Sequence, residues 1–427
     1  MNIEKITIKN FRNIGNESSF ALNYKFTTII GINGKGKSTI LHALRIACGA
    51  YFLAIPEVKK RHIKSDEIRQ IDVGHSLTQQ RPVKIEAVGT FPGLKKPISW
   101  KRQILENSNT TTSSEAEVGS IRNIGKANYN KISKTGNDRV SLPVIAFFGT
   151  SRAHGAGRNI KPRVGREIFK EGYQDWYEMK STTFKYESWL RSYNVLQKHG
   201  KERSHTRDAF VAALKTANPY IVDVETEGES LYLKVNIDGL VSDILPIELH
   251  SDGIRFFTEM VAEIAYRCIT LNGYLDAEAV LQSKGIVMID EIDLHLHPNW
   301  QKHVVRDLKS AFPNIQFVVT THSPFIVQSL KTEELINLDP VEGLDEDPDK
   351  YSIEEIASQE MGVSHVERSE TFIEMQNAAK EYFNLIKAGA SDDDINAAKL
   401  LLDSLRIKYN NDPAYVALLE SEFPQAL

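Results

Sequence analysis

Residues 31–39 carry the clearest chemical pattern in the chain, a glycine-rich turn followed by a lysine and two hydroxyl residues. The stretch reads GINGKGKST and fits GxxxxGKS/T. Glycines let the backbone curl so that several N–H groups face one anion, and a following helix adds its positive end. Lys37 would neutralise the β- and γ-phosphates, and Ser38 would offer a hydroxyl to Mg²⁺. This segment predicts a site for a nucleoside triphosphate with Mg²⁺.

Two carboxylates, Asp290 and Glu291, form the second candidate group. They follow the apolar run GIVMI at residues 285–289, which is typical of a buried parallel strand. Ligands of parallel sheets bind at the carboxyl ends of the strands. We therefore expect Asp290 to hold Mg²⁺ and Glu291 to orient or deprotonate an attacking water.

Two further segments have the right residue types but are ambiguous alone. His322 follows the apolar run 316–321, and a lone histidine is more often structural than catalytic. Residues 248–255 read ELHSDGIR and precede an amphipathic helix. Ser251 and Gly253 would present a hydroxyl, a bare backbone and a helix N-terminus to an anion. Taken alone, this segment is better explained as a simple helix cap.

Two clusters invite a metal-binding interpretation that we reject. His295 and His297 form a His-x-His pair on an expected loop, with no third ligand nearby, so we predict a turn that starts a helix at Pro298. The three residues 392–394 are aspartates that follow Ser391 at an expected helix start. We interpret them as capping and dipole charges rather than a nuclease site.

The periodicity of apolar residues predicts the elements that position these groups. Strands are expected at about 3–9, 25–31, 83–91, 98–105, 142–150, 230–237, 285–290 and 316–321. Helices are expected at about 37–53, 183–217, 252–271, 298–311, 352–361, 366–388, 391–409 and 412–421. Residues 106–120 are polar and low in complexity, which predicts a surface loop.

Charge and cysteine usage limit the class of protein. The chain of 427 residues carries −4, and residues 331–360 alone carry −9, so the remainder carries +5. Basic residues gather at two places that could contact phosphates. They are Lys59, Lys60, Arg61 and Lys64, and then Arg152, Arg158, Lys161, Arg163, Arg166 and Lys170.

Cys48 and Cys268 are predicted to be buried packing residues in a reducing compartment. The N-terminus lacks a signal-peptide pattern and no apolar run reaches about 20 residues, so we expect a cytoplasmic protein without membrane contact.

The order of these motifs, together with the strand end Asn10-Phe11-Arg12, resembles the RecF/OLD/SMC-like branch of ABC ATPases. Three stretches narrow the resemblance to stand-alone ATPases that include Septu PtuA and retron-associated relatives. They are LPVIAFFGTSR, the SDGIR segment, and MIDEIDLHLHPNWQ followed by FPNIQFVVTTHSP. The resemblance covers residues 1–330 and implies an α/β fold, the ABC-type P-loop head with a mixed sheet and flanking helices. It implies head segments at 1–150 and 230–330, a mostly helical insertion at 151–229, and an acidic linker with a helical partner-binding region at 331–427.

The resemblance also assigns roles to single residues. It implies that His322 is a switch histidine near the γ-phosphate. Ser251, Asp252 and Gly253 would form a signature that grips the ATP of a second subunit. The nucleotide itself would be held by Arg12, Asn33, Gly34, Lys35, Gly36, Lys37, Ser38 and Thr39, with Ser38 and Asp290 at the metal and residues 65–69 beside the base or ribose. Arg152 is a candidate for contact with nucleotide or DNA, and Gln70, Gln79 and Gln80 are candidates for the Q-loop glutamine. One departure is His250, where the family usually has leucine.

The function implied is an ATPase that dimerises around ATP and Mg²⁺ and regulates a partner HNH nuclease, PtuB-like, in anti-phage defence. Contact with DNA through that complex is expected. The tail after 330 lacks the acidic pattern of a Toprim domain, so no nuclease activity of its own is predicted. Two alternatives stay open: a RecF-like DNA-repair ATPase without a nuclease partner, and an ATP-bound scaffold with little turnover.

Overall fold

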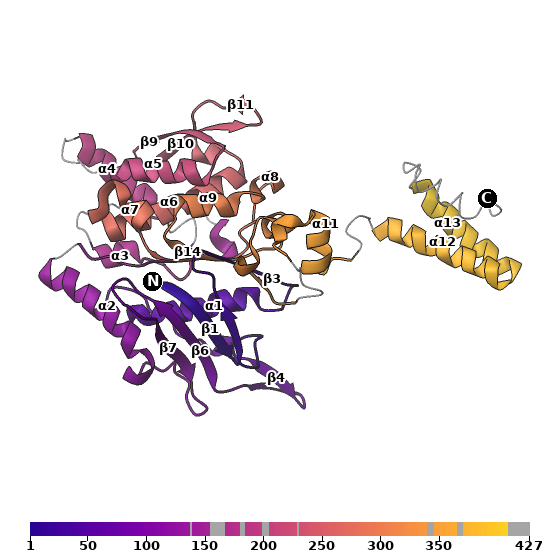
Figure 1. The fold of residues 1–427 in the computed structure, drawn as a ribbon, viewed down its shortest axis with the longest axis horizontal. Coiled ribbons are helices and arrows are strands. Elements are labelled where there is room, and N and C mark those ends of the chain that lie inside the picture. Colours follow the sequence, from indigo (N-terminus) through magenta and orange to yellow (C-terminus); the bar gives the residue numbers. More distant parts are fainter. Residues whose placement is uncertain are drawn as a thin grey trace.

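The computed structural model shows an α/β head followed by a helical hairpin at the C-terminal end (Figure 1). It describes residues 1–136, 139–153, 167–179, 184–198, 205–228, 230–339, 346–364 and 370–408. The hairpin, formed by α12 (Glu370–Ala388) and α13 (Asp392–Lys408), stands apart from the head. Among the described helices, none is both long enough and apolar enough to cross a bilayer.

A five-stranded parallel sheet forms the centre of the head, in the order β15-β3-β14-β13-β8. The strands are β3 (Phe26–Ile30), β8 (Val144–Phe148), β13 (Gly285–Ile289), β14 (Ile315–Thr320) and β15 (Leu335–Asn337). The first four are buried along their whole length, as expected when helices cover both faces of a parallel sheet. Because the strands run in one direction, their carboxyl ends meet along one edge, where ligands of such sheets bind.

An antiparallel sheet forms a second lobe, in the order β2-β1-β6-β7. Its strands are β1 (Asn2–Lys9), β2 (Ser18–Ala21), β6 (Val83–Thr90) and β7 (Ile98–Ile104), and the hairpin of β4 (Gln70–Val73) and β5 (Ser76–Gln79) lies below them in Figure 1. Gln316 of β14 ties the two sheets together: its Nε2 donates to the carbonyl of Ile3, and its Oε1 accepts from the N–H of Ile3, both at 2.8 Å.

Helices and a small sheet surround these strands. The helices of the head are α1 (Lys37–Gly49), α2 (Glu115–Thr135), α3 (Ile168–Gly172), α4 (Tyr186–Lys198), α5 (Thr206–Ala217), α6 (Asp252–Asn272), α7 (Ala279–Gln282), α8 (Pro298–Gln301), α9 (Val304–Ala311) and α10 (Pro324–Gln328). The small sheet contains β9 (Ile221–Glu227), β10 (Ser230–Ile237), β11 (Leu240–Val241) and β12 (Leu245–Pro246). In Figure 1, α5, α6, α7 and α9 lie on the side of the central sheet opposite the antiparallel lobe.

Buried charges fix α6 to the chain that precedes it. Glu263 and Arg267 are buried and form an ion pair at 3.1 Å one turn apart. Glu263 accepts hydrogen bonds from the N–H groups of Lys185 and Tyr186, and Arg267 donates to the carbonyls of Gly172 and Gln174, both at 2.7 Å. A buried ion pair is stable only when such additional partners satisfy it.

The segment after residue 330 first adds a strand to the head, and only then leads into the hairpin of α12 and α13. β15 pairs with β3, and Leu338 N–H donates to the carbonyl of Ile30 at 3.0 Å. Asn337 then holds Glu360 through its Nδ2, at 2.7 Å to the carbonyl and 2.8 Å to Oε2. α12 and α13 build a separate apolar cluster from Met375, Ala378, Ala379, Tyr382, Phe383, Leu402 and Leu405. The boundary predicted at 330 therefore falls just before a strand of the central sheet.

Most of the predicted elements are confirmed, with one clear error. The eight predicted strands correspond to β1, β3, β6, β7, β8, β10, β13 and β14. The predicted loop at 106–120 is wrong from Glu115 onward, where α2 begins. The side chain of Ser114 donates to Glu117 at 2.8 Å, and Val118 and Ile121 pack into the core, so tertiary burial outweighs the polar composition. The helix predicted at 412–421 lies outside the described residues, and the buried positions predicted for both cysteines are confirmed.

The close pairing of β13 and β8 generates a stability prediction. A Cβ on Gly285 would lie 1.9 Å from the carbonyl oxygen of Val144, whereas nothing lies within 4 Å of a Cβ on Gly273. Gly285→Ala should therefore lower the free energy of unfolding by about 2–4 kcal/mol. Gly273→Ala, at a φ of −60°, should leave it unchanged or raise it by about 0.4–1 kcal/mol. Denaturant titration of both variants checks this, and equal effects would contradict the packing of β13 on β8.

Candidate functional site

The phosphate loop, residues 31–39, connects the buried β3 to α1. Gly31, Gly34 and Gly36 have φ angles of 144°, 86° and 110°, a region that residues with side chains rarely adopt. A Cβ on Gly36 would also lie 3.1 Å from Oδ1 of Asn13. The path of the backbone therefore requires glycine at these positions.

Lys37 is buried at the start of α1 and is held inside the loop. Its Nζ donates to the carbonyls of Gly31 and Ile32, at 2.8 and 3.3 Å. Burial lowers the pKa of Lys37, while Asp290 and Glu291 act in the opposite direction. A phosphate group in the loop would give this desolvated ammonium a full counter-charge, which neutral carbonyls do not.

Asp290 joins the phosphate loop to the central strands. It follows β13, and its Oδ1 accepts a hydrogen bond from Ser38 Oγ at 3.0 Å and another from Thr320 Oγ1 at 2.6 Å. The backbone N–H of Asp290 donates to the carbonyl of Phe148, at the end of β8, at 2.8 Å. The hydroxyl and the carboxylate predicted to share a metal ion, 252 residues apart in sequence, thus lie in contact.

Glu291 and His322 lie at the same edge of the sheet. Glu291 is half-buried and has a φ of 51°, which costs a non-glycine residue about 1–3 kcal/mol. Its N–H donates to Thr320 Oγ1 at 2.8 Å, a bond that helps hold this conformation. His322 follows β14 by two residues and is exposed. Strain of this kind is often found at functional sites.

Arg12 is brought to the 65–69 segment by a buried carboxylate. Its Nη2 lies 3.3 Å from Oε1 of Glu67, and its N–H donates to the carbonyl of Glu67 at 2.8 Å. Glu67 also holds Arg61 from the basic cluster that the sequence indicated. Two groups that the resemblance placed at the nucleotide are therefore neighbours in the structure.

These residues line a polar cavity of about 310 Å³ next to Asp290. The lining includes Arg12, His42, Arg45, Arg61, Lys64, Asp66, Glu67, Phe147, Gly149, Thr150, Ser151, Tyr177 and Glu178. Burial and the adjacent Arg45 lower the pKa of His42 to about 2, which favours the neutral imidazole ring. The cations of the cavity suit an anionic or polar portion of a nucleotide beyond the phosphate loop.

Asn13 is a site residue that no sequence motif indicates. Its Oδ1 accepts from Thr39 Oγ1 at 2.6 Å, and its Nδ2 donates to the carbonyl of Gly34. Asn13 thus links the middle of the phosphate loop to its end, from the antiparallel lobe. The only hint in the sequence to a role for Asn13 is that it directly follows Arg12, a predicted nucleotide-binding residue.

The Q-loop candidates lie elsewhere. Gln70 and Gln79 face each other across the β4–β5 hairpin, and the N–H of Gln80 donates to the carbonyl of Arg69. None of the three glutamines lines the cavity beside Asp290, where Thr150 and Ser151 stand after β8. Arg152 lies in the same turn, but its side chain is outside the described set.

The signature segment, residues 248–255, begins α6. Ser251 is exposed at the N-cap, and its carbonyl accepts from Arg255 N–H at 2.9 Å. A Cβ on Gly253 would lie 2.3 Å from the carbonyl oxygen of His295, so glycine permits this close approach. His250, the departure from the family pattern, lies with Nε2 3.2 Å from the carbonyl of Leu233 and 3.3 Å from that of Leu245. Both are acceptors, so Nε2 carries the proton and ties the segment to the small sheet.

The oxygen donors suit Mg²⁺, whereas the His-x-His pair does not form a metal site. Ser38 and Asp290 supply a hydroxyl and a carboxylate, hard ligands that Mg²⁺ combines with phosphate oxygens and water. His297 Nδ1 instead accepts from Asn299 N–H at 3.3 Å and caps α8, while the ring of His295 packs on Phe256. Within the described part of the chain, no group of three His, Cys, Asp or Glu side chains could hold a metal ion.

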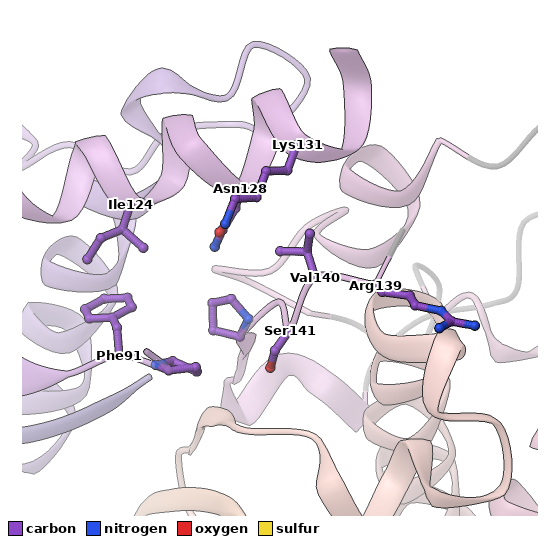
Figure 2. Close-up of a pocket in the computed structure, with 9 residues that line it drawn as sticks. Phe91, Ile124, Asn128, Lys131, Arg139, Val140 and Ser141 are labelled. Carbon is purple, nitrogen blue, oxygen red and sulfur yellow. The ribbon is translucent and has the colours of Figure 1, made fainter. Parts of the chain in front are cut away.

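A second cavity, of about 230 Å³, lies away from the phosphate loop between α2 and residues 139–143 (Figure 2). Phe91, Ile124 and Val140 supply the apolar part of its lining, and Asn128 and Lys131 line it from α2. Arg139 points away from the other labelled side chains in Figure 2. Residues of the predicted nucleotide site do not line this cavity.

Comparison with known proteins identifies the family. Residues 26–328 match the family described as "AAA domain, putative AbiEii toxin, Type IV TA system". The chain belongs to this AAA domain family. The matched range contains the phosphate loop, both carboxylates and His322, whereas Arg12 and Asn13 precede it.

Several relatives of this AAA domain protein have names that describe what those relatives do. A retron Vc95 probable ATPase of Vibrio cholerae serotype O1 biovar El Tor is 24% identical over 72% of this chain and 68% of its own length. A Septu protein PtuA of Bacillus mycoides (strain KBAB4) is 26% identical over 77% of this chain but only 39% of its own length. Another Septu protein PtuA, from Bacillus thuringiensis, is 36% identical over 27% of this chain and 30% of its own length. An SMC head domain from Thermotoga maritima, 16% identical, covers 77% of this chain and 92% of its own with a TM-score of 0.43.

The environment of Lys37 generates a binding prediction. Lys37→Ala should weaken ATP affinity by about 10–100-fold, because a buried phosphate would lose a charge-assisted partner worth about 1.5–3 kcal/mol. Lys84→Ala, a surface ion-pair variant on β6, is the matched control and should bind normally. Titration with a fluorescent ATP analogue measures both. Unchanged affinity in Lys37→Ala would show that the nucleotide binds elsewhere.

Proposed function

We propose that this chain is the ATP-binding and ATP-hydrolysing subunit of an anti-phage defence system. The observation that carries the proposal is the contact between Ser38 and Asp290, which joins the phosphate loop to the carboxylate strand. A loop alone would support nucleotide binding only. A loop whose hydroxyl meets a carboxylate beside Glu291 supports hydrolysis as well. The names of the retron and Septu relatives support the biological setting.

Each residue of one copy has a distinct task in this proposal. Lys37 and the loop N–H groups bind the phosphates, and Arg12 with the 65–69 segment lies beside the ribose or base. Ser38 and Asp290 would hold Mg²⁺, which neutralises charge that develops on the phosphate oxygens. Glu291 orients or deprotonates water, and His322 stands near the γ-phosphate.

A second copy of the chain would complete the site. The exposed Ser251 and the tightly packed Gly253 start a 21-residue helix whose N-terminus attracts an anion. Contacts to a γ-phosphate held by the partner would favour the closed pair only in the ATP state. A differential affinity of a few kcal/mol is enough for a useful switch.

We further propose that the closed and open states control a partner HNH nuclease, and that DNA is contacted through this complex. The hairpin of α12 and α13 supports a docking role because it stands apart from the head and carries exposed Leu400 and Leu401. Co-purification from the native operon with mass spectrometry tests this. Recovery without an HNH protein would favour a RecF-like DNA-repair ATPase.

The position of Glu291 predicts how turnover responds to mutation. Glu291→Gln should lower the rate of phosphate release by about 10²–10⁴-fold, because the amide cannot accept a proton, while ATP binding is retained. Glu354→Gln, exposed on α11 (Ile353–Glu355), is the control and should match the wild type. Equal and negligible release from all three proteins would instead favour the ATP-bound scaffold.

The exposure of Ser251 predicts an effect on assembly alone. Ser251→Arg should leave ATP binding by single copies intact but prevent ATP-dependent dimerisation, because a bulky side chain would occupy the phosphate contact. The matched control is Ser120→Arg, an equally bulky change at an exposed serine of α2, which should dimerise normally. Sedimentation velocity with and without ATP measures both. Normal ATP-dependent dimers of Ser251→Arg would rule out the signature contact.

A further inference from the structure

Thr320, the last residue of β14, is fully buried between the two groups that the proposed reaction needs. Its Oγ1 lies 2.6 Å from Asp290 Oδ1, and the same Oγ1 receives the N–H of Glu291 at 2.8 Å. The carbonyl of Thr320 accepts from Ile292 N–H at 3.0 Å. Thr320 therefore contacts three consecutive residues, 290–292, directly after β13.

The direction of the hydrogen bonds follows from the groups themselves. A backbone N–H can only donate, so the Thr320 oxygen accepts from Glu291. The hydroxyl has one proton left to donate, and the neighbouring carboxylate oxygen of Asp290 is its acceptor. Glu291 N–H, the Thr320 hydroxyl and the Asp290 carboxylate thus form an ordered chain in which each partner has one role.

We propose that Thr320 is a positioning residue: its hydroxyl fixes the carboxylate of Asp290 for the metal ion and the backbone of Glu291 for the attacking water. This inference rests on the proposed function of the same site. Ser38 donates to the same Asp290 oxygen at 3.0 Å, so this oxygen is held by two hydroxyls from different segments of the chain. Groups that orient a metal ligand typically change metal affinity or activity by 10–100-fold when removed.

The neighbouring strand offers a matched control. Thr28 of β3 is fully buried in the same sheet, and β3 pairs with β14 with Thr28 opposite Val319. Its hydroxyl has no hydrogen-bond partner among the described residues. Thr28→Val therefore removes a buried hydroxyl from this sheet without removing a hydrogen bond.

The test removes the Thr320 hydroxyl in two ways. Thr320→Val removes it but keeps a branched side chain of similar size. Thr320→Ala removes both the hydroxyl and the methyl group, whereas Thr320→Ser removes the methyl group alone. Thr320→Val should lower kcat for ATP by about 10–100-fold with KM within about threefold, and weaken Mn²⁺ binding to the complex with a non-hydrolysable ATP analogue by about tenfold. Thr320→Ser and Thr28→Val should stay within about threefold of the wild type in both measurements, and Thr320→Ala should resemble Thr320→Val.

Electron paramagnetic resonance of Mn²⁺ separates this proposal from the proposed function. If the wild type hydrolyses no ATP, the ATPase proposal fails, and Mn²⁺ affinity alone still decides the role of Thr320. Wild-type kcat and Mn²⁺ affinity in Thr320→Val would overturn the inference. A loss in Thr320→Ser as large as in Thr320→Ala would also overturn it, because the methyl group would then matter and the hydroxyl would not. If Thr320→Val does not fold, as judged by thermal unfolding, the Thr320→Ser and Thr320→Ala pair gives the answer.

Discussion

The carboxylate of Asp290 is the point on which the candidate site depends. It stands at the carboxyl end of β13, between β14 and β8, and accepts hydrogen bonds from Ser38 and Thr320. A buried carboxylate is tolerated when donors satisfy it. Here the donors come from the phosphate loop and from the adjacent strand. Because the Asp290 carboxylate needs both hydrogen bonds, two segments that are distant in sequence are held side by side.

The antiparallel lobe completes what the parallel sheet begins. Asn13 closes the phosphate loop through Thr39 and Gly34, and Glu67 holds Arg12 beside the cavity. Asn13 follows β1, and Glu67 lies in the chain after α1. The hydrogen bonds between Gln316 and Ile3 keep the two sheets together. The nucleotide we propose would therefore lie between two lobes, with its phosphates fixed by one and its remainder by the other.

The sequence predicted those features that depend on local pattern. A pattern of about ten residues, glycine spacing or apolar periodicity, is enough to identify three of them. They are the phosphate loop, the apolar strand before Asp290 and the helix after Ser251. Thr320 and Asn13 could not be assigned roles, because their partners lie far away in sequence and only the fold brings them together. α2 was missed from Glu115 because its stability comes from burial against the lobe, and a polar composition hides that. The hydrogen bonds of His250 could not be predicted either, because their acceptors belong to the small sheet, whose arrangement only the fold shows.

The central claim is that one ATP is held by the phosphate loop of one copy and the signature segment of another. Mixing two variants tests it directly, at an ATP concentration too low for Lys37→Ala to bind: Lys37→Ala lacks the loop contact, and Ser251→Arg lacks the signature contact. In a mixed pair, the intact loop of one copy meets the intact signature of the other, so one complete site is restored. The account predicts that the mixture hydrolyses ATP although neither variant does so alone. A mixture that stays as inactive as its components, while mixed pairs form, would contradict the shared site.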